Sequence, residues 1–229
     1  MPLLLQLLQV SIRKHSGKVP HQATLNSHNS AYFAHCKTPL TCLVQASESL
    51  PLKKLNLGGL SFHPYSCSLV ANSLMKLESV DFHRAEVSVQ LLRNLLDNLR
   101  NPNKEFCNLK HVRFGGFVDW WTKFEQVPDT LFVEGLASLV SVELPNNLKA
   151  EKIKQLLTRI KTADSVRLKE INFGFTELGK IPAALLADSL LKLETVTIGS
   201  DRLFLGHPNI TITTEQVKIF SVSLKYCFL

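Results

Sequence analysis

The sequence predicts an α/β fold in which one strand–helix unit is written several times along the chain. Three observations point to it: six segments match the pattern L-x-x-[LIV]-x-[LIF], each alternates apolar and polar residues, and helix-like stretches separate them. Alternation at every second residue is the strand period, and self-similarity at intervals of roughly 20 to 50 residues is typical of stacked repeat arrays. The six segments begin at Leu52, Leu77, Leu109, Leu139, Leu168 and Leu193.

The strand segments are of two kinds, and the kinds alternate. The first opens with Leu-Lys and is followed by glycine, as in "LKKLNLGGL" from Leu52 and "LKHVRFGGF" from Leu109. The second follows a helix-like stretch, and "NSLMKLESV" from Asn72 and "DSLLKLETV" from Asp188 are near copies of each other. Segments of the first kind begin 57 and 59 residues apart. The full unit is therefore strand–helix–strand–helix, in which stacked neighbours share one core.

Two kinds of helix are expected between these strands. Pro64, Pro128 and Pro182 each precede an apolar stretch with helical spacing, and proline suits the first turn of a helix. The stretches "VQLLRNLLDNL" and "EKIKQLLTRI" predict helices of the second kind, and "TITTEQVKIF" indicates the start of a third, with Thr213 as N-cap and Gln216 three residues on. The expected buried faces are Leu91, Leu92, Leu95, Leu96 and Leu99 in the first of these and Ile153, Leu156, Leu157 and Ile160 in the second.

Charge separates the start of the chain from the rest. The protein's formal charge is +7, and residues 1–40 hold four basic residues and no acidic one. Residues 41–200 hold 19 basic and 17 acidic residues, so the repeated region is nearly neutral. We expect residues 1–42 to form an irregular basic arm or a degenerate repeat. Residues 43–229 are expected to form the repeat domain, with about six recognisable strands.

Together these segments resemble the leucine-rich repeats of the ribonuclease-inhibitor type over about residues 43–220. The resemblance implies a right-handed solenoid, a horseshoe segment with a parallel sheet on its concave side and helices on its convex side. Members of this family are overwhelmingly protein-binding modules: inhibitors, sensor domains and substrate-recognition parts of ubiquitin ligases. The family motif places Asn or Cys three residues after the last apolar strand position, where the side chain bonds buried loop backbone. Here only Asn147 fits, although Thr176 and Asp201 are able to make similar bonds.

In such a fold the polar positions of each strand point to the concave surface, and the charges at these positions alternate in sign from strand to strand. Two interpretations stay open: cross-strand charge pairing that supports the register, or a striped surface that selects a partner of complementary pattern. Alternating charge is a poor track for a nucleic acid, whose phosphates favour continuous positive charge. The candidate partner-binding residues on this surface are Lys53, Glu78, Asp81, Lys110, Arg113, Glu143 and Lys169.

One glycine-linked loop is longer than its counterparts and carries both tryptophans of the protein. Pro128 lies 14 residues after the end of its strand, against 7 and 9 residues in the other two loops of this kind. Long loops in compact arrays are often functional, and tryptophan is enriched at binding hot spots. Trp120, Trp121 and Phe124 are therefore further candidates for contact with a partner. The alternative is that their rings fold back and cover the core.

No segment indicates catalysis, a cofactor or a metal site. The stretch "GFTELGK" from Gly174 has the glycine spacing of a phosphate-binding loop, but Ile181 follows where Ser or Thr would hold Mg²⁺. Four histidines between His15 and His35 recur more widely than zinc ligands do. Five irregularly spaced cysteines favour a reducing compartment, and no apolar run is long enough to cross a bilayer. We therefore expect a cytoplasmic location without membrane attachment.

The sequence thus predicts a non-enzymatic module that binds another protein. Two alternatives stay open. The first is a recognition fragment of a larger regulator, such as a ubiquitin-ligase adaptor or an innate sensor, because the array ends without an evident polar capping repeat. The second is weak nucleic-acid binding through the basic arm. The sequence indicates neither the partner's identity nor the oligomeric state.

Overall fold

The structure is a computed structural model of the chain. It describes residues 11–12, 22–24, 53–58, 67–83, 85–101, 107–115, 120–164, 166–174, 176, 178–198 and 210–213. Side chains are described for these residues except in 11–12, 22–24, 120–121 and 210–213.

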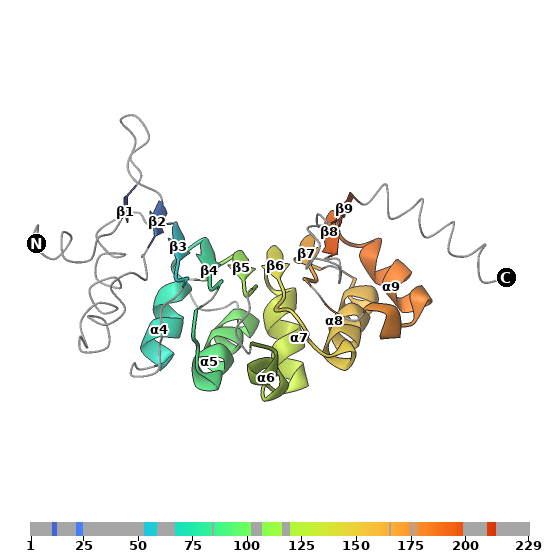
Figure 1. The fold of residues 1–229 in the computed structure, drawn as a ribbon, viewed down its shortest axis with the longest axis horizontal. Helices are drawn as coiled ribbons and strands as arrows, with labels where there is room; N and C mark the ends of the chain where they lie inside the picture. The colour runs from blue at the N-terminus through green and yellow to red at the C-terminus, as the bar shows by residue number, and fades with distance from the viewer. Residues whose placement is uncertain are drawn as a thin grey trace, which may run out of the picture.

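The described strands form one sheet in which they follow each other in chain order. Strands β2 to β8 run parallel, while β1 is antiparallel to β2 and β9 is antiparallel to β8. Figure 1 shows the strands side by side along one edge of the molecule. The strands are β1 (Ser11–Ile12), β2 (Gln22–Thr24), β3 (Lys54–Asn56), β4 (Ser79–Asp81), β5 (His111–Arg113), β6 (Ser141–Glu143), β7 (Glu170–Asn172), β8 (Thr195–Ile198) and β9 (Ile210–Thr213).

All six strand segments expected from the sequence are present, as β3 to β8. They pair in one register, because each central apolar residue is the Cα partner of the central residue in the next strand. These residues face the core, and the polar residues on either side of them point the other way, as the strand period requires. The six central residues are Leu55, Val80, Val112, Val142, Ile171 and Val196.

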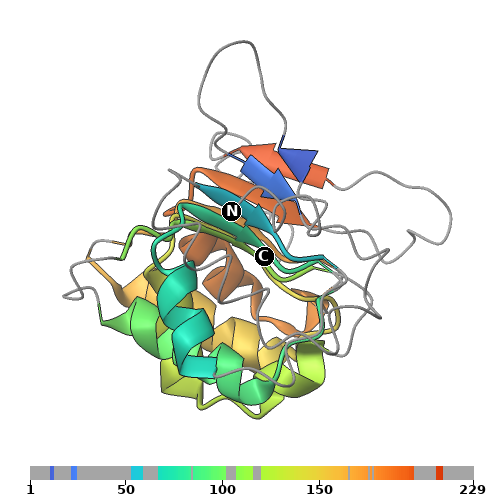
Figure 2. The ribbon, with the colours of Figure 1, turned by 90° about the vertical axis from the view of Figure 1, so that its left-hand side faces the viewer.

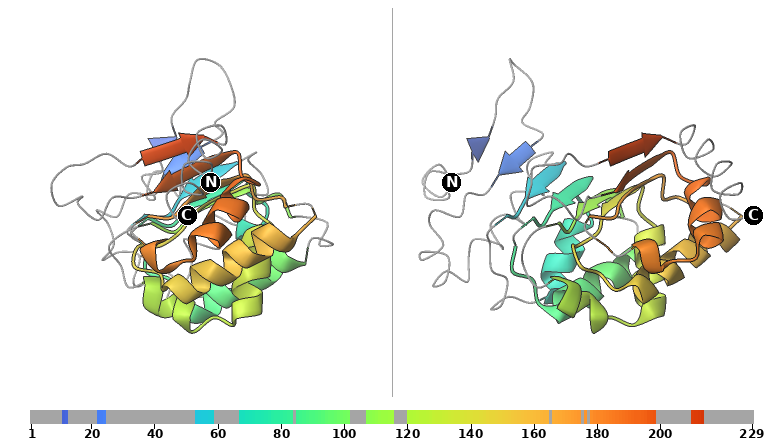
Figure 3. Two further views of the ribbon diagram at one scale, coloured as in Figure 1. Left: turned by 90° about the vertical axis from the view of Figure 1, so that its right-hand side faces the viewer. Right: turned by 45° about the vertical axis from the view of Figure 1, so that its right-hand side comes forward.

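The helices lie on one side of this sheet. Figures 2 and 3 show them as a second layer beneath the strands, and Figure 1 shows the strands on the concave side of an arc and the helices on its convex side. The protein is thus an α/β structure with a parallel sheet covered by helices on one face. The described helices are α4 (Cys67–Leu74), α5 (Val89–Arg100), α6 (Trp120–Glu125), α7 (Asp129–Ala137), α8 (Ala150–Thr162), the 3₁₀ helix η2 (Leu178–Lys180) and α9 (Ala183–Leu190).

The helix signals in the sequence are confirmed at α5, α7, α8 and α9. Pro128 and Pro182 are the N-cap residues of α7 and α9, immediately before the first helical residue. The hydroxyl of Ser88 caps α5 by accepting a hydrogen bond from Leu91 N at 3.1 Å. The expected leucine and isoleucine faces of α5 and α8 are buried throughout. These buried faces belong to the one hydrophobic core that the described strands and helices share.

The expectation for Phe124 as a partner-contacting residue is wrong. Its side chain is completely buried, and its ring packs edge-on against Phe114 at 5.1 Å and against Phe132 at 5.5 Å between centroids. Helix α6 therefore closes the core between the sheet and α7. Trp120 and Trp121 form the first turn of α6, but their side chains lie outside the described part of the structure.

Two further expectations need correction. Asn147 is exposed with a φ of 61°, so it turns the chain at the surface, and the adjacent Leu148 is buried in its place. Thr176 is buried, but its hydroxyl makes none of the expected backbone bonds within the described part of the chain. Thr213 ends strand β9, and the rest of the helix expected there lies outside the described residues. Asp201 lies outside them as well.

The structure describes little of the expected N-terminal arm. Two short strands, β1 and β2, come from residues 1–42, and β2 pairs parallel with β3. The other residues up to position 52, and with them the expected boundary at residue 42, lie outside the described part.

Candidate functional site

The face of the sheet opposite the helices is a candidate binding surface. We call it the open face; it comprises the polar residues that flank the central apolar residue of β3 to β8, together with the residue that precedes each of these strands. Helices cover the other face of the sheet and none of the described helices covers this one (Figures 2 and 3). The flanking pairs are Lys54 and Asn56, Ser79 and Asp81, His111 and Arg113, Ser141 and Glu143, Glu170 and Asn172, and Thr195 and Thr197.

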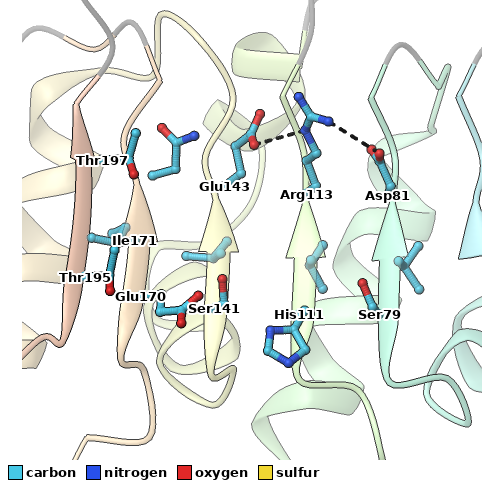
Figure 4. Close-up of a pocket in the computed structure, with 14 residues that line it drawn as sticks. Ser79, Asp81, His111, Arg113, Ser141, Glu143, Glu170, Ile171, Thr195 and Thr197 are labelled. Carbon is cyan, nitrogen blue, oxygen red and sulfur yellow. Dashed lines mark ion pairs between the residues drawn. The ribbon is translucent and has the colours of Figure 1, made fainter. Parts of the chain in front are cut away.

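A hollow with a volume of about 280 Å³ lies on this face over strands β4 to β8. Its walls are polar side chains of alternate strand residues, and Figure 4 shows these side chains standing on the same side of the sheet. The hollow lies on the concave side of the arc that the strands form in Figure 1. The parallel strand ladder beneath it fixes their spacing at roughly 4.8 Å per strand.

Arg113 is the central charged residue of the hollow. Its Nε lies 3.0 Å from Glu143 Oε2 on β6, and its Nη1 lies 3.6 Å from Asp81 Oδ2 on β4 (Figure 4). Glu143 rests directly over Gly115, since a Cβ at that position would lie 2.0 Å from Glu143 Oε1. The absence of a side chain at Gly115 therefore makes room for the carboxylate that pairs with Arg113.

Three strand ends are held by the side chain of their last residue. Asn56, Asp81 and Asn172 accept hydrogen bonds through Oδ1 from the backbone N–H two residues on, at 2.8, 2.7 and 2.9 Å respectively. Such bonds are the local Asx-turn pattern that stops a strand. Gly174, which donates the last of these bonds, has a φ of +56°, a region that favours glycine. These bonds hold the backbone in place at the C-terminal ends of three strands of the open face.

The row of residues that precede the strands shows the cross-strand pairing expected from the sequence. Lys110 Nζ lies 3.4 Å from Glu78 Oε1, and Lys169 pairs with Glu194. The hydrogen bond from Lys110 holds the pKa of the Glu78 carboxyl below its usual range. All four side chains are partly exposed, so water and salt screen both pairs and neither contributes much to stability.

A few ionisable residues of the open face have no such partner. Glu170, His111, Lys53 and Lys54 take part in no ion pair or side-chain hydrogen bond among the residues that the structure describes. Glu170 and His111 lie in the same row, one on each side of Ser141, because Ser141 is the Cα partner of both. Figure 4 shows the Glu170 side chain directed toward Ser141.

This row contains the residue types of a catalytic triad in an unsuitable order. A triad needs the histidine between the nucleophile and the acid, whereas here Ser141 lies between His111 and Glu170. None of the hydrogen bonds among the described residues joins Ser141 to His111. In the same part of the chain, no group of three His, Cys, Asp or Glu side chains is placed to hold a metal ion.

The structure brings most of the predicted surface residues together and adds others to them. Asp81, Arg113 and Glu143 line the hollow. The hollow also takes residues that were not selected from the sequence. The strand pattern could have identified them, because each occupies one of the two polar positions that flank the central apolar residue. Most of them are uncharged, and the selection from the sequence was based on charge. These residues are Ser79, His111, Ser141, Glu170, Asn172, Thr195 and Thr197.

Comparison with models of known protein families gives no match, and comparison with curated proteins gives none either. Among the described residues, no helix has the length and apolar character needed to cross a membrane.

Proposed function

We propose that the chain is a leucine-rich-repeat module of the ribonuclease-inhibitor type that binds another protein, without enzymatic activity, through the open face of its sheet. The observation that carries the proposal is the polar hollow on the concave side, which none of the described helices covers. Further support comes from the six strand segments, which pair in one register, and from the described helices, which lie on the opposite side of the sheet.

The open face is suited to a protein partner because contacts within the protein position several of its side chains. Arg113 is held by carboxylates on both neighbouring strands, and the strand ends are held by side-chain hydrogen bonds. A surface that is ordered in the free protein loses less conformational entropy on association. These contacts therefore favour specific binding.

Protein is favoured over nucleic acid by the charge of this face. It carries five basic and five acidic residues, and most of them are paired across strands. Nucleic-acid binding depends on the neutralisation of many phosphates by unpaired Lys and Arg side chains. The basic segment 1–40 lies almost entirely outside the described residues, so the open face is the surface on which the proposal rests.

The same face would serve an independent protein or the recognition part of a larger regulator such as a ligase adaptor or a sensor. A cytoplasmic location agrees with the two described cysteines, Cys67 and Cys107, which form no disulfide with each other. Fractionation of cells that express the tagged chain would test this location.

Site-specific photo-crosslinking tests the proposal directly. A photoreactive p-benzoylphenylalanine would replace Ser141 in the hollow or, as a matched control, Thr158 on the exposed surface of α8. After circular dichroism confirms that both proteins fold, we expect a discrete protein adduct from position 141 and none from position 158. An adduct only from position 158, or equal adducts from both positions, would refute binding through the open face.

A further inference from the structure

The charged residues of the hollow leave an excess of negative charge. Three carboxylates, those of Asp81, Glu143 and Glu170, line it together with a single guanidinium, that of Arg113. Arg113 already pairs with Asp81 and Glu143, and Glu170 pairs with nothing among the described residues. An anionic ligand would therefore meet net repulsion here, whereas a cation would meet an unused carboxylate.

The surroundings of Glu170 favour a side-chain cation. Ser141 and Thr195 are its Cα partners on the two neighbouring strands, so a hydroxyl that is able to accept a hydrogen bond lies on each side of the carboxylate. Glu143 lies on β6, the strand next to Glu170, and adds to the negative potential. Lys and Arg present three or five N–H donors, which match a carboxylate flanked by hydroxyl oxygens.

The net charge of the open face changes sign from one end of the sheet to the other. The half made by β3, β4 and β5 carries four basic residues against two acidic ones. The half made by β6, β7 and β8 carries one basic residue against three acidic ones. The excess is therefore +2 at one end and −2 at the other. The basic residues of the first half are Lys53, Lys54, Lys110 and Arg113, and the acidic residues of the second half are Glu143, Glu170 and Glu194.

We infer that the protein partner anchors a lysine or arginine side chain at Glu170, between Ser141 and Thr195, and places acidic residues over Lys53 and Lys54. This inference rests on the proposed function, since it names the chemistry of the partner that the open face would take. The opposite arrangement would bring like charges together at both ends, which is the usual source of discrimination between orientations.

The span of the sheet sets the spacing of these charges in the partner. Four strand intervals separate β3 from β7, or about 19 Å at roughly 4.8 Å per interval. An extended peptide advances about 3.3 Å per residue, so the acidic and basic residues of a linear partner segment lie about six residues apart. This spacing defines a probe peptide: two glutamates and two arginines separated by five glycine and serine residues.

The experiment is a fluorescence titration of this peptide, labelled with a dye, against the wild-type protein and two variants. Glu170→Gln removes the proposed anchor, and Glu151→Gln removes a carboxylate from the exposed surface of α8 as the matched control. We expect Glu170→Gln to weaken binding by roughly 1.4-fold to fivefold, the range of an exposed ion pair. Glu151→Gln is expected to leave the affinity unchanged. A peptide with glutamine in place of both arginines should bind wild type as weakly as the original binds Glu170→Gln.

The direction of binding is read by a nitroxide spin label at one end of the peptide. With the label at the arginine end, the amide NMR signals of Ser141 and Thr195 should broaden more than that of Lys54, and a label at the glutamate end should reverse this.

Equal affinity for all three proteins, or broadening in the opposite order, overturns the inference. If a partner also cross-links at position 141, the proposed function nevertheless stands. If the peptide binds at Glu170 and no protein cross-links there, the cation anchor stands and the proposed function fails.

Discussion

Gly135 allows helix α7 to approach helix α5 closely, and its replacement gives a sharp test of this packing. A Cβ at position 135 would lie 2.9 Å from Leu96 Cδ2 and 3.0 Å from both the Cβ and the carbonyl oxygen of Leu96. The last two atoms belong to the backbone and the root of the side chain in α5, so no rotamer change removes them. Gly135→Ala must therefore push the two helices apart.

The size of the effect follows from two opposing contributions. Alanine is favoured over glycine inside a helix by about 1 kcal/mol. An extra methyl group in a packed interior costs about 1–3 kcal/mol, and the contact with fixed atoms of Leu96 puts Gly135→Ala at the upper end, about 3 kcal/mol. The net expectation is a loss of about 2 kcal/mol in the free energy of unfolding.

Urea unfolding followed by circular dichroism measures this loss. Gly179→Ala is the matched control, because nothing lies within 4 Å of a Cβ at that position. We expect the control to change stability by no more than about 0.5 kcal/mol. If Gly135→Ala proves as stable as the wild type, α5 and α7 are not held at this separation and the packing argument is wrong.

Three further predictions follow from other contacts. Lys152 is buried and bonds to Asp129, and that bond holds the pKa of the Asp129 carboxyl below its usual range. Because the folded pKa is depressed, the resulting stability is present above the unfolded pKa of about 3.9 and is lost as the pH falls through the folded value. Asp129 is half exposed, so Asp129→Asn should lower the free energy of unfolding by less than about 1 kcal/mol at pH 7. Urea unfolding at pH 7 and pH 3 should show that the stability of this variant changes less with pH than that of the wild type. An unchanged pH dependence would contradict this. Ser189 is buried and donates to carbonyl oxygens of both α8 and α9, so Ser189→Ala should lower stability by about 0.5–1 kcal/mol in the same assay, and a gain in stability would contradict it. The double variant Trp120→Ala, Trp121→Ala should keep the cross-link from position 141, because the open face is formed by other elements; loss of the adduct in a folded variant would place the binding site on α6 instead.

The open face and the helix layer respond to different kinds of change. Substitutions at Gly135, Asp129 or Ser189 alter contacts between helices and should change stability without altering the hollow. Glu170→Gln should do the reverse, because its carboxylate contributes no ion pair to the described fold. Stability and binding are therefore expected to separate cleanly in this protein.

The sequence by itself determined the order and position of the main elements. Each strand segment alternates apolar and polar residues over a few positions, and each of the leucine-rich helices has an apolar face at helical spacing, as in Leu91, Leu95 and Leu99. Such periodicities are local, so they predict strand, helix and buried face without knowledge of neighbours. The cross-strand pairing of Lys110 with Glu78 followed from the same register.

Only the tertiary structure decided which side chains are available to a partner. The sequence pattern around Phe124 suits a surface loop as well as it suits a core helix, and only the rings of Phe114 and Phe132 on other elements bury it. Likewise, Arg113 meets two carboxylates and Glu170 meets none because of how strands distant in sequence lie side by side. Burial and charge pairing depend on contacts between distant segments, and periodicity along the chain does not contain that information.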